Sequence, residues 1–296
     1  MYIVSYRSGD SWRAGIVEGA FLADAAALDP PSGPSTVRAF LDAGPAAVDQ
    51  LLERARDAFR RKSEQLMPLE EVELGPPVPD PDKIICLGLN YREHANEVRM
   101  NTSVVPPLFA KFRNALCGPT SPIVIPRVST KIDYEGELVV VIGRRCRGVA
   151  EEEALACVAG YTIMNDVSAR DLQMQSSQWT AGKTLDTFAP MGPGIVPASE
   201  IPDPQTLRIV TRVNGETLQN GNTRDMIFPV ARTIAFLSSL MTLQPGDLIA
   251  TGTPSGVGFT RKPPVFLKDG DLVEVEIERI GMIRNPVVGP GGGEEH

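Results

Sequence analysis

An apolar, β-branched run preceded by two carboxylates is the feature that most constrains the fold of this chain. Glu135 and Glu137 lie two residues apart at the head of the run, which covers residues 138–142. On a strand, side chains two apart point to the same face, so both carboxylates face the same way. A second apolar run ends at Asp166. If the two strands are neighbours, Asp166 faces the pair.

Three converging carboxylates repel one another unless a cation neutralises them. Oxygen ligands favour a hard divalent cation, which is Mg²⁺, Mn²⁺ or Ca²⁺. The alternative is two strand ends at the surface with solvated acids, because the Glu-x-Glu pattern is short and common. The spacing alone leaves both interpretations open.

Composition and charge limit the class of protein. The chain has 296 residues, enough for one large domain or for a small domain and a larger one. Its net charge of −8 argues against a nucleic-acid partner. It has no apolar run near the roughly 18 residues of a membrane helix, and its N-terminus lacks a signal-peptide pattern. Its four cysteines have no C-x-x-C spacing, so we expect reduced thiols in a cytoplasmic protein.

A proline-rich segment, residues 74–82, divides the chain. Its four prolines exclude a helix or a central strand. We therefore predict an α+β N-terminal domain at 1–75, a linker at 76–82, a β-rich α+β catalytic domain at 83–290 and a flexible tail at 291–296. In the N-terminal part, strands are expected at 2–6 and 12–17, and helices at 35–43 and 46–62.

Strands separated by glycine and proline dominate the second part. Strands are predicted at 83–91, 123–126, 207–213 and 271–277, and helices at 92–98, 151–158 and 229–241. Asn214-Gly215 is a typical hairpin turn. This order differs from the βαβ alternation of a parallel sheet.

His94 and Glu97 are three residues apart on the helix predicted at 92–98, so they share a face. A carboxylate beside a histidine orients the ring and raises its basicity, as a general base that activates water requires. A surface pair at this spacing is the commoner case. The position after a buried strand and a turn favours the functional interpretation.

Three further segments offer binding groups. Lys183 lies in a mostly uncharged stretch and could stabilise an oxyanion, although lone lysines are usually solvated. Arg170 and Gln173 follow Asp166 and suit a substrate carboxylate; the alternative is a structural pair of Arg170 with Asp171 or Glu97. The glycine-rich loop at 251–258 could bind a carboxylate through its amides, which is weak evidence alone.

Taken together, five motifs in order resemble the fumarylacetoacetate hydrolase family over about residues 84–287. The motifs are GLNYREHANE (88–97), DYEGEL (133–138), NDVSARD (165–171), GKTLDTFAPMGP (182–193) and GDLIATGTP (246–254). Their order and spacing are more specific than any one of them.

The resemblance implies a catalytic domain of mixed sheets rolled into a barrel-like shape, usually in a homodimer. It implies Mg²⁺, sometimes Mn²⁺ or Ca²⁺, with Glu135, Glu137 and Asp166 at the positions of its ligands. The water-activating pair corresponds to His94 and Glu97, and the site lysine to Lys183. The substrate-binding positions correspond to Arg170, Gln173 and Thr253.

The resemblance also implies a substrate class, the 2,4-diketo acids. Hydrolysis of an acylpyruvate to pyruvate, or a substituted pyruvate, and a carboxylic acid is the first expectation. Decarboxylation of oxaloacetate, and isomerisation or dehydration of a 2-oxo acid, use the same metal-stabilised enolate. A different class is a metal-dependent binding protein without catalysis, against which the retained His94, Glu97 and Lys183 argue.

Overall fold

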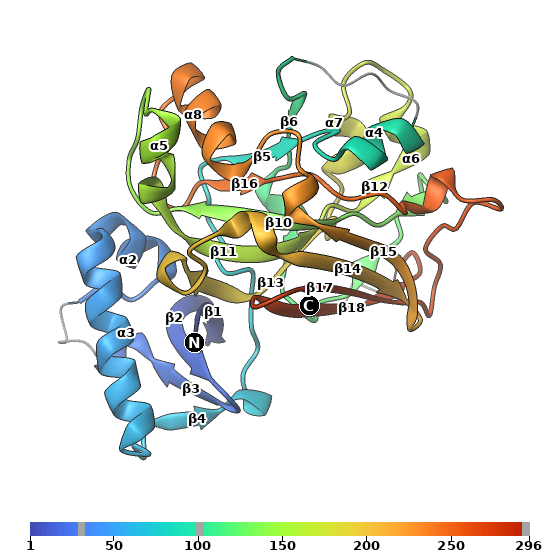
Figure 1. The fold of residues 1–296 in the computed structure, drawn as a ribbon. Helices are drawn as coiled ribbons and strands as arrows, with labels where there is room; N and C mark the ends of the chain where they lie inside the picture. The colour runs from blue at the N-terminus through green and yellow to red at the C-terminus, as the bar shows by residue number, and fades with distance from the viewer. Residues whose placement is uncertain (29–32, 99–103, 292–296) are drawn as a thin grey trace.

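The computed structural model describes residues 1–28, 33–98 and 104–291. Most of the predicted flexible tail, 291–296, therefore lies outside the described residues. The described part is a mixed α+β fold rich in strands (Figure 1). No helix in those ranges combines the length and the apolar character that crossing a membrane requires.

The largest sheet has eleven strands and contains the apolar run at residues 138–142. Its order is β4-β3-β2-β1-β13-β11-β10-β16-β5-β6, with β7 paired to β13. The strands are β1 (Tyr2–Ser8), β2 (Ser11–Glu18), β3 (Phe21–Asp24), β4 (Leu66–Pro68), β5 (Ile84–Leu87), β6 (Leu108–Ala110), β7 (Leu116–Cys117), β10 (Gly136–Ile142), β11 (Val158–Asn165), β13 (Ala189–Pro197) and β16 (Leu248–Ala250).

The central pair, β10 and β11, forms where the sequence predicts two neighbouring strands. The two strands run antiparallel with Gly136 opposite Asn165. Every residue of β10 is buried, so β-branched side chains pack on both faces of the sheet. The register brings the start of β10 beside the end of β11, which is where the carboxylates lie.

A second sheet packs beside the first and contains five strands in the order β15-β14-β17-β18-β8. They are β8 (Ile123–Val124), β14 (Arg208–Val213), β15 (Glu216–Asn222), β17 (Leu272–Ile277) and β18 (Gly281–Val288). The predicted Asn214-Gly215 hairpin is confirmed, with φ of 51° and 81° at its two turn residues. β9 (Ile132–Asp133) and β12 (Ser168–Ala169) form a separate pair.

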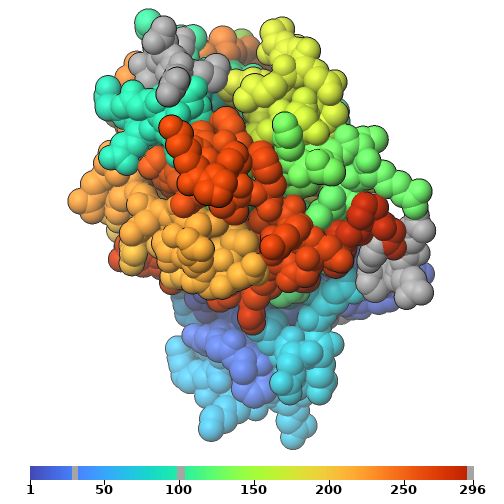
Figure 2. Space-filling model, turned by 90° about the vertical axis from the view of Figure 1, so that its right-hand side faces the viewer, coloured from blue at the N-terminus to red at the C-terminus, as the bar shows by residue number. Residues whose placement is uncertain are grey.

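The expectation of a barrel-like shape is not met. In the described part of the chain the strand pairings form open sheets, whose outer strands do not pair with each other. The large sheet continues from the catalytic strands into the N-terminal part because β1 pairs with β13 at Ile3 and Ile195. Figures 1 and 2 show the N-terminal residues, in blue, gathered at one end of the molecule. The division into two domains stays a prediction.

The proline-rich segment has no helix and no strand, as predicted, and part of it is buried. Residues 75–78 are buried. The amide of Gly75 donates to the carbonyl of Ser5, and the Ser5 hydroxyl donates to the carbonyl of Pro77. These bonds fix the segment against β1.

Helices cover the sheets and carry several candidate residues (Figure 1). All five predicted helices form, within a few residues of the predicted ends. The helices are α1 (Ala25–Leu28), α2 (Val37–Ala43), α3 (Pro45–Arg60), α4 (Arg92–Glu97), α5 (Glu151–Ala154), α6 (Arg170–Gln173), α7 (Thr180–Lys183) and α8 (Val230–Leu240).

Asn90 fixes the turn between β5 and α4. Its side-chain amide donates to the carbonyls of Phe228 and Thr251, and its Oδ1 accepts from the amide of Phe228. Asn90 is fully buried, so water cannot replace its side chain as the hydrogen-bond partner of these backbone groups. The turn that carries His94 is thereby tied to the residues before α8 and after β16.

We expect Asn90→Ala to lower the free energy of unfolding by about 3 kcal/mol, because it leaves buried backbone groups without partners. Chemical denaturation with a circular-dichroism readout measures this. Asn220→Ala is the matched control, since Asn220 is exposed and should change the free energy by less than about 1 kcal/mol. Equal effects of the two substitutions would refute this role of Asn90.

Candidate functional site

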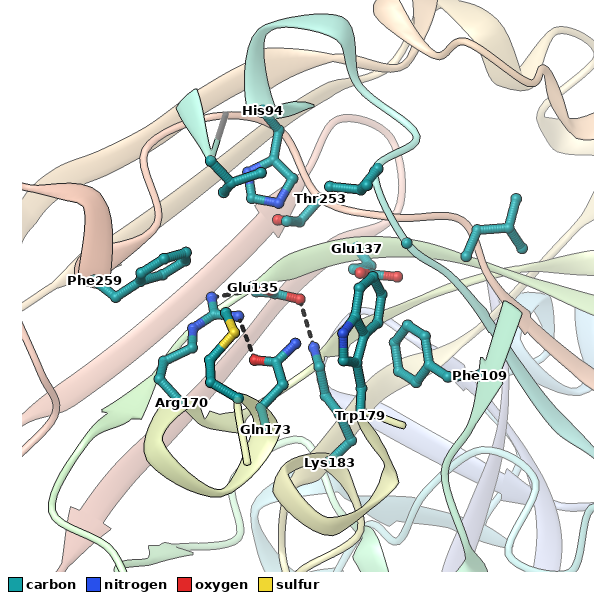
Figure 3. A pocket seen from close by; sticks show the side chains of 15 residues that line it. His94, Phe109, Glu135, Glu137, Arg170, Gln173, Trp179, Lys183, Thr253 and Phe259 are labelled. Carbon is teal, nitrogen blue, oxygen red and sulfur yellow. Dashed lines mark hydrogen bonds and ion pairs between the residues drawn. The ribbon is translucent and has the colours of Figure 1, made fainter. Parts of the chain in front are cut away.

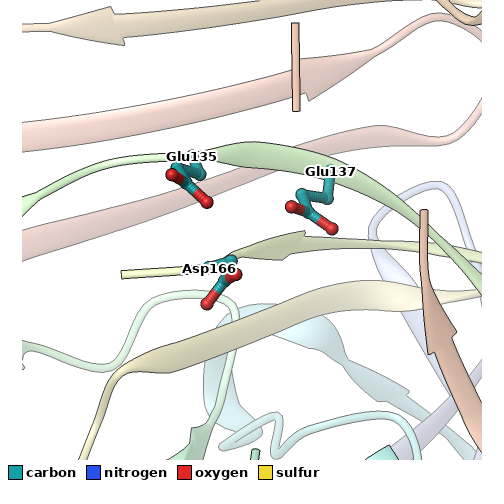
Figure 4. A group of neighbouring side chains, drawn as sticks. All are labelled: Glu135, Glu137 and Asp166. Carbon is teal, nitrogen blue, oxygen red and sulfur yellow. The ribbon is translucent and has the colours of Figure 1, made fainter. Parts of the chain in front are cut away.

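Glu135, Glu137 and Asp166 lie together at the meeting point of β10 and β11 (Figure 4). One carboxylate oxygen from each lies within 4.8 Å of the others, and all three residues are buried. The amide of Asp166 donates to the carbonyl of Glu135 over 2.8 Å, which extends the strand pairing to the carboxylates. The predicted convergence is confirmed, and the alternative of solvated surface acids is wrong.

Lys183, at the end of α7, bridges two of the carboxylates. Its Nζ donates to Glu135 Oε2 over 2.8 Å and to Asp166 Oδ2 over 2.7 Å. Burial opposes the charge of Lys183, but Asp166 and Glu135 raise its pKa above the usual value. Burial likewise opposes the charge of Glu135, and Lys183 and Arg170 lower its pKa. Lys183 is therefore a buried ammonium group and not a solvated surface lysine.

Lys111 is a second buried lysine at the site, and the sequence argument missed it. It follows β6, and its Nζ donates to Asp166 Oδ1 over 2.5 Å and to the carbonyl of Val167 over 3.1 Å. The pKa of Lys111 is lowered from its usual value, chiefly by burial and also by the charge of Lys183, although Asp166 opposes the shift. A single charge inside the apolar run Leu108-Phe109-Ala110-Lys111-Phe112 is the signal that could have revealed it.

Arg170, at the start of α6, pairs with other acids than the sequence suggested. Its Nε donates to Asp133 Oδ2 over 2.8 Å, and its Nη2 lies 2.7 Å from Glu135 Oε1. Its Nη1 donates to Gln173 Oε1 over 3.0 Å. The predicted alternative, a pair of Arg170 with Asp171 or Glu97, is therefore wrong. The strand pairing brings Asp133 and Glu135 to Arg170 instead.

Of the four buried carboxylates at the site, Glu137 is the one for which the described residues provide no ion pair. It accepts a hydrogen bond from the amide of Gly252 over 2.8 Å, the first glycine of the predicted loop. Burial, followed by the charges of Asp166 and Glu135, raises its pKa well above the usual value. Thr253, next in the loop, donates from its hydroxyl to the carbonyl of Gly136 over 3.0 Å.

The charge balance and the ligand atoms fit a divalent cation. Four buried carboxylates, those of Asp133, Glu135, Glu137 and Asp166, face three buried cations, which leaves an excess of negative charge among these groups. A cation beside Glu137 would offset the burial and the repulsion that raise the pKa of this carboxyl. Carboxylate oxygens are the ligands that Mg²⁺, Mn²⁺ and Ca²⁺ share.

His94 and Glu97 form the predicted pair on α4. His94 Nδ1 lies 3.3 Å from Glu97 Oε2, and His94 is buried. Burial opposes the charge of Glu97, but its hydrogen bonds with His94, Thr260 and Gly256 lower its pKa. Glu97 is therefore an ionised hydrogen-bond acceptor. It contacts Nδ1 of the His94 imidazole, which leaves Nε2 for a ligand.

One cavity brings seven of the nine predicted residues together (Figure 3). His94 lies on one side, with Arg170, Gln173 and Lys183 opposite it and the carboxylates between. The predicted residues that line it are His94, Glu135, Glu137, Arg170, Gln173, Lys183 and Thr253. Asp166 and Glu97 lie behind them, each in contact with a lining residue.

Aromatic side chains close one wall of this cavity. Phe109 and Trp179 meet edge to face with ring centroids 5.5 Å apart, and Lys183 Nζ lies 5.0 Å from the centre of the Phe109 ring. Trp179 packs against Gly88, where an added Cβ would lie 2.3 Å from the indole. The site therefore combines buried charges at one end with an aromatic wall beside them.

The matching family model and the similar known proteins agree on one protein family. The family model "Fumarylacetoacetate (FAA) hydrolase C-terminal" matches residues 83–288. The oxaloacetate tautomerase fahd2, mitochondrial, of Xenopus laevis is 44% identical over 294 residues, 97% of this chain and 90% of that protein.

Two solved structures show the same fold. The maleylpyruvate hydrolase of Sphingobium sp. SYK-6, in complex with manganese(II) and pyruvate, is 35% identical with a TM-score of 0.79 over 98% of this chain and all of that one. The 2-hydroxyhepta-2,4-diene-1,7-dioate isomerase of Mycobacterium marinum is 35% identical with a TM-score of 0.73, over 98% of this chain and 99% of that one. The chain belongs to the fumarylacetoacetate hydrolase family.

Proposed function

We propose that this protein is a divalent-metal-dependent enzyme that interconverts the keto and enol forms of a 2-keto acid, with oxaloacetate as its first candidate substrate. The observation that carries the proposal is the buried cluster of Glu135, Glu137, Asp166 and Lys183 in one cavity. The oxaloacetate tautomerase relative, which matches nearly the whole chain, supports the choice of reaction.

Glu135, Glu137 and Asp166 would hold the cation, with Mg²⁺ as first choice and Mn²⁺ or Ca²⁺ as alternatives. When bound, it supplies positive charge that stabilises the enolate of a 2-keto acid. The manganese(II) and pyruvate in the related maleylpyruvate hydrolase support this assignment.

Arg170 and Gln173 would bind the substrate carboxylate. Arg170 lines the cavity, and its buried Nη2 forms an ion pair with Glu135 Oε1 over 2.7 Å, which places the guanidinium beside the proposed metal ligands. Thr253 lines the same cavity and would contact the substrate with its backbone or hydroxyl. An arginine beside an amide side chain suits a planar carboxylate.

His94 and Lys183 would move the protons. In keto–enol exchange one proton leaves C3 and one arrives at the C2 oxygen. His94, oriented by Glu97, takes the proton from C3, and Lys183 supplies the proton at the oxygen. Both side chains line the cavity from opposite sides (Figure 3).

Hydrolysis of a 2,4-diketo acid is the second candidate, favoured by the pair of His94 with Glu97. In that reaction His94 would take a proton from water, the hydroxide would attack the C4 carbonyl, and the C3–C4 bond would break. The carboxylic acid leaves, and the proton held by His94 returns to C3 to give pyruvate. Decarboxylation of oxaloacetate, dehydration and isomerisation of other 2-oxo acids share the enolate. A cytoplasmic location and a homodimer stay part of the proposal.

A substrate panel tests the proposal. Purified protein is given oxaloacetate, acetylpyruvate and fumarylpyruvate, with Mg²⁺ and with EDTA. We expect faster decay of the oxaloacetate enol absorbance with Mg²⁺ only, with no loss of total oxaloacetate. Consumption of the diketo acids would establish hydrolysis instead, and loss of oxaloacetate to pyruvate would establish decarboxylation. Turnover of none of them would refute the proposal.

Metal binding has its own test in the substitution Asp166→Asn. We expect it to weaken Mn²⁺ binding by roughly 100-fold or more, because a coordinating carboxylate is lost and even outer partners of a metal site contribute 10- to 100-fold. Isothermal titration calorimetry measures the dissociation constant. Glu276→Gln, at an exposed position of β17, is the control and should leave it unchanged. Similar affinity in both variants would contradict the assignment.

His94→Ala separates catalysis from metal binding. We expect the rate constant kcat to fall by roughly 10²- to 10⁴-fold, the range of a lost general base. The Mn²⁺ affinity should stay within about twofold, because His94 pairs with Glu97, and within the described part of the chain no hydrogen bond or ion pair is found between His94 and the three carboxylates that would bind the metal. His296→Ala, at the only other histidine of the chain, is the control. Loss of Mn²⁺ binding in His94→Ala would show that the roles are misassigned.

A further inference from the structure

Glu97 receives hydrogen bonds from a loop as well as from His94. The Thr260 hydroxyl donates to Glu97 Oε1 over 2.7 Å. The amide of Gly256 lies 3.1 Å from Oε1 and 3.2 Å from Oε2. Thr260 ends the short helix η7 (Gly258–Thr260), more than 150 residues after Glu97 in the chain. Glu97 is therefore fixed from two sides, by its own helix and by a distant loop.

The loop that carries Thr260 is itself firmly placed. The hydroxyl of Tyr134, the neighbour of Glu135, donates to the carbonyl of Gly256 over 3.1 Å, and Arg261 Nε donates to the same carbonyl. Gly256 has φ of +105°, and a Cβ there would lie 2.1 Å from the carbonyl oxygen of Leu218. The loop cannot shift freely, so it can serve as a fixed reference for Glu97.

The Thr260 hydroxyl has one proton and two acceptors in reach. The carbonyl of Val257 lies 2.9 Å from it, and Glu97 Oε1 lies 2.7 Å from it. A carboxylate is the stronger acceptor and gives the shorter bond. The hydroxyl therefore donates to Glu97, and the contact with Val257 is secondary.

Fixing Glu97 also fixes the imidazole. Glu97 accepts from His94 Nδ1, which selects the ring form with its proton on that nitrogen and frees the other to accept a proton. The ring lies over the cavity above Thr253 (Figure 3). If Glu97 turned away, both the ring form and its direction would be lost.

We propose that Thr260 is a positioning residue for proton transfer, which holds Glu97 so that His94 presents its unprotonated nitrogen to the substrate. The inference rests on the proposed role of His94. Thr260 itself is not among the residues that line the cavity, although its neighbour Phe259 is. The side-chain hydrogen bonds of Thr260 go to Glu97 and to the carbonyl of Val257, so we infer that its hydroxyl acts through Glu97.

The test compares Thr260→Val, which removes the hydroxyl at nearly equal size, with Thr260→Ser, which keeps it. In a His296→Ala background His94 is the only imidazole, so its two ¹⁵N signals report which nitrogen carries the proton. We expect the proton on Nδ1 in the background protein and in Thr260→Ser, and a mixture of both ring forms in Thr260→Val.

Activity and metal binding complete the comparison. We expect kcat on the accepted keto acid to fall roughly tenfold in Thr260→Val with little change in KM, the scale of a lost outer partner, and to recover in Thr260→Ser. The Mn²⁺ affinity should not change. An unchanged proton position in Thr260→Val, or a loss of Mn²⁺ affinity in it, would overturn the inference. Absence of any turnover by the parent protein would refute the proposed function, while the ¹⁵N signals would still decide the role of Thr260.

Discussion

The ion pairs of Lys183 with Glu135 and Asp166 are the interaction on which the site depends. Buried carboxylates at the adjoining ends of β10 and β11 would repel one another and lose their hydration without compensation. Lys183 and Lys111 hold the two oxygens of Asp166 from different sides, and Arg170 holds Glu135. Glu137 has the least positive charge near it, and its pKa is raised by burial and by the neighbouring carboxylates. A divalent cation beside Glu137 would restore the charge balance. The buried cations therefore allow the carboxylates to lie together, and the proposed divalent cation would complete the charge balance.

One enolate-stabilising site of the proposed kind could support several reactions. Their names include a tautomerase, an isomerase and a hydrolase. Enolate formation is common to these reactions, and the outcome depends on where a proton or a water molecule is delivered. In this chain the groups proposed to deliver protons are His94, which pairs with Glu97, and Lys183, which bridges two carboxylates. Phe109 and Trp179 form an apolar part of the cavity lining beside these charged groups.

Local sequence patterns predicted the helices and strands that position the site. They could not predict which residues far apart in the chain contact each other. The strand pair followed from two apolar runs, and the shared face of Glu135 and Glu137 from the period of a strand. The partners of Arg170 were missed because Asp133 lies 37 residues away and is brought close by strand pairing. Lys111 was missed because one lysine in a short apolar run does not show which acid it meets. Open sheets in place of a barrel-like shape are likewise a matter of pairing between distant strands.

The proposed function requires that Glu135, Glu137 and Asp166 bind a divalent cation at which a 2-keto acid is enolised. A crystal structure with Mn²⁺ and oxalate, a stable mimic of the enolate, would decide this. We expect one strong anomalous peak between the three carboxylates, with oxalate on the side of Arg170 and Gln173. Manganese bound elsewhere, or three carboxylates that stay paired only with Lys183 and Lys111 in saturating Mn²⁺, would contradict it.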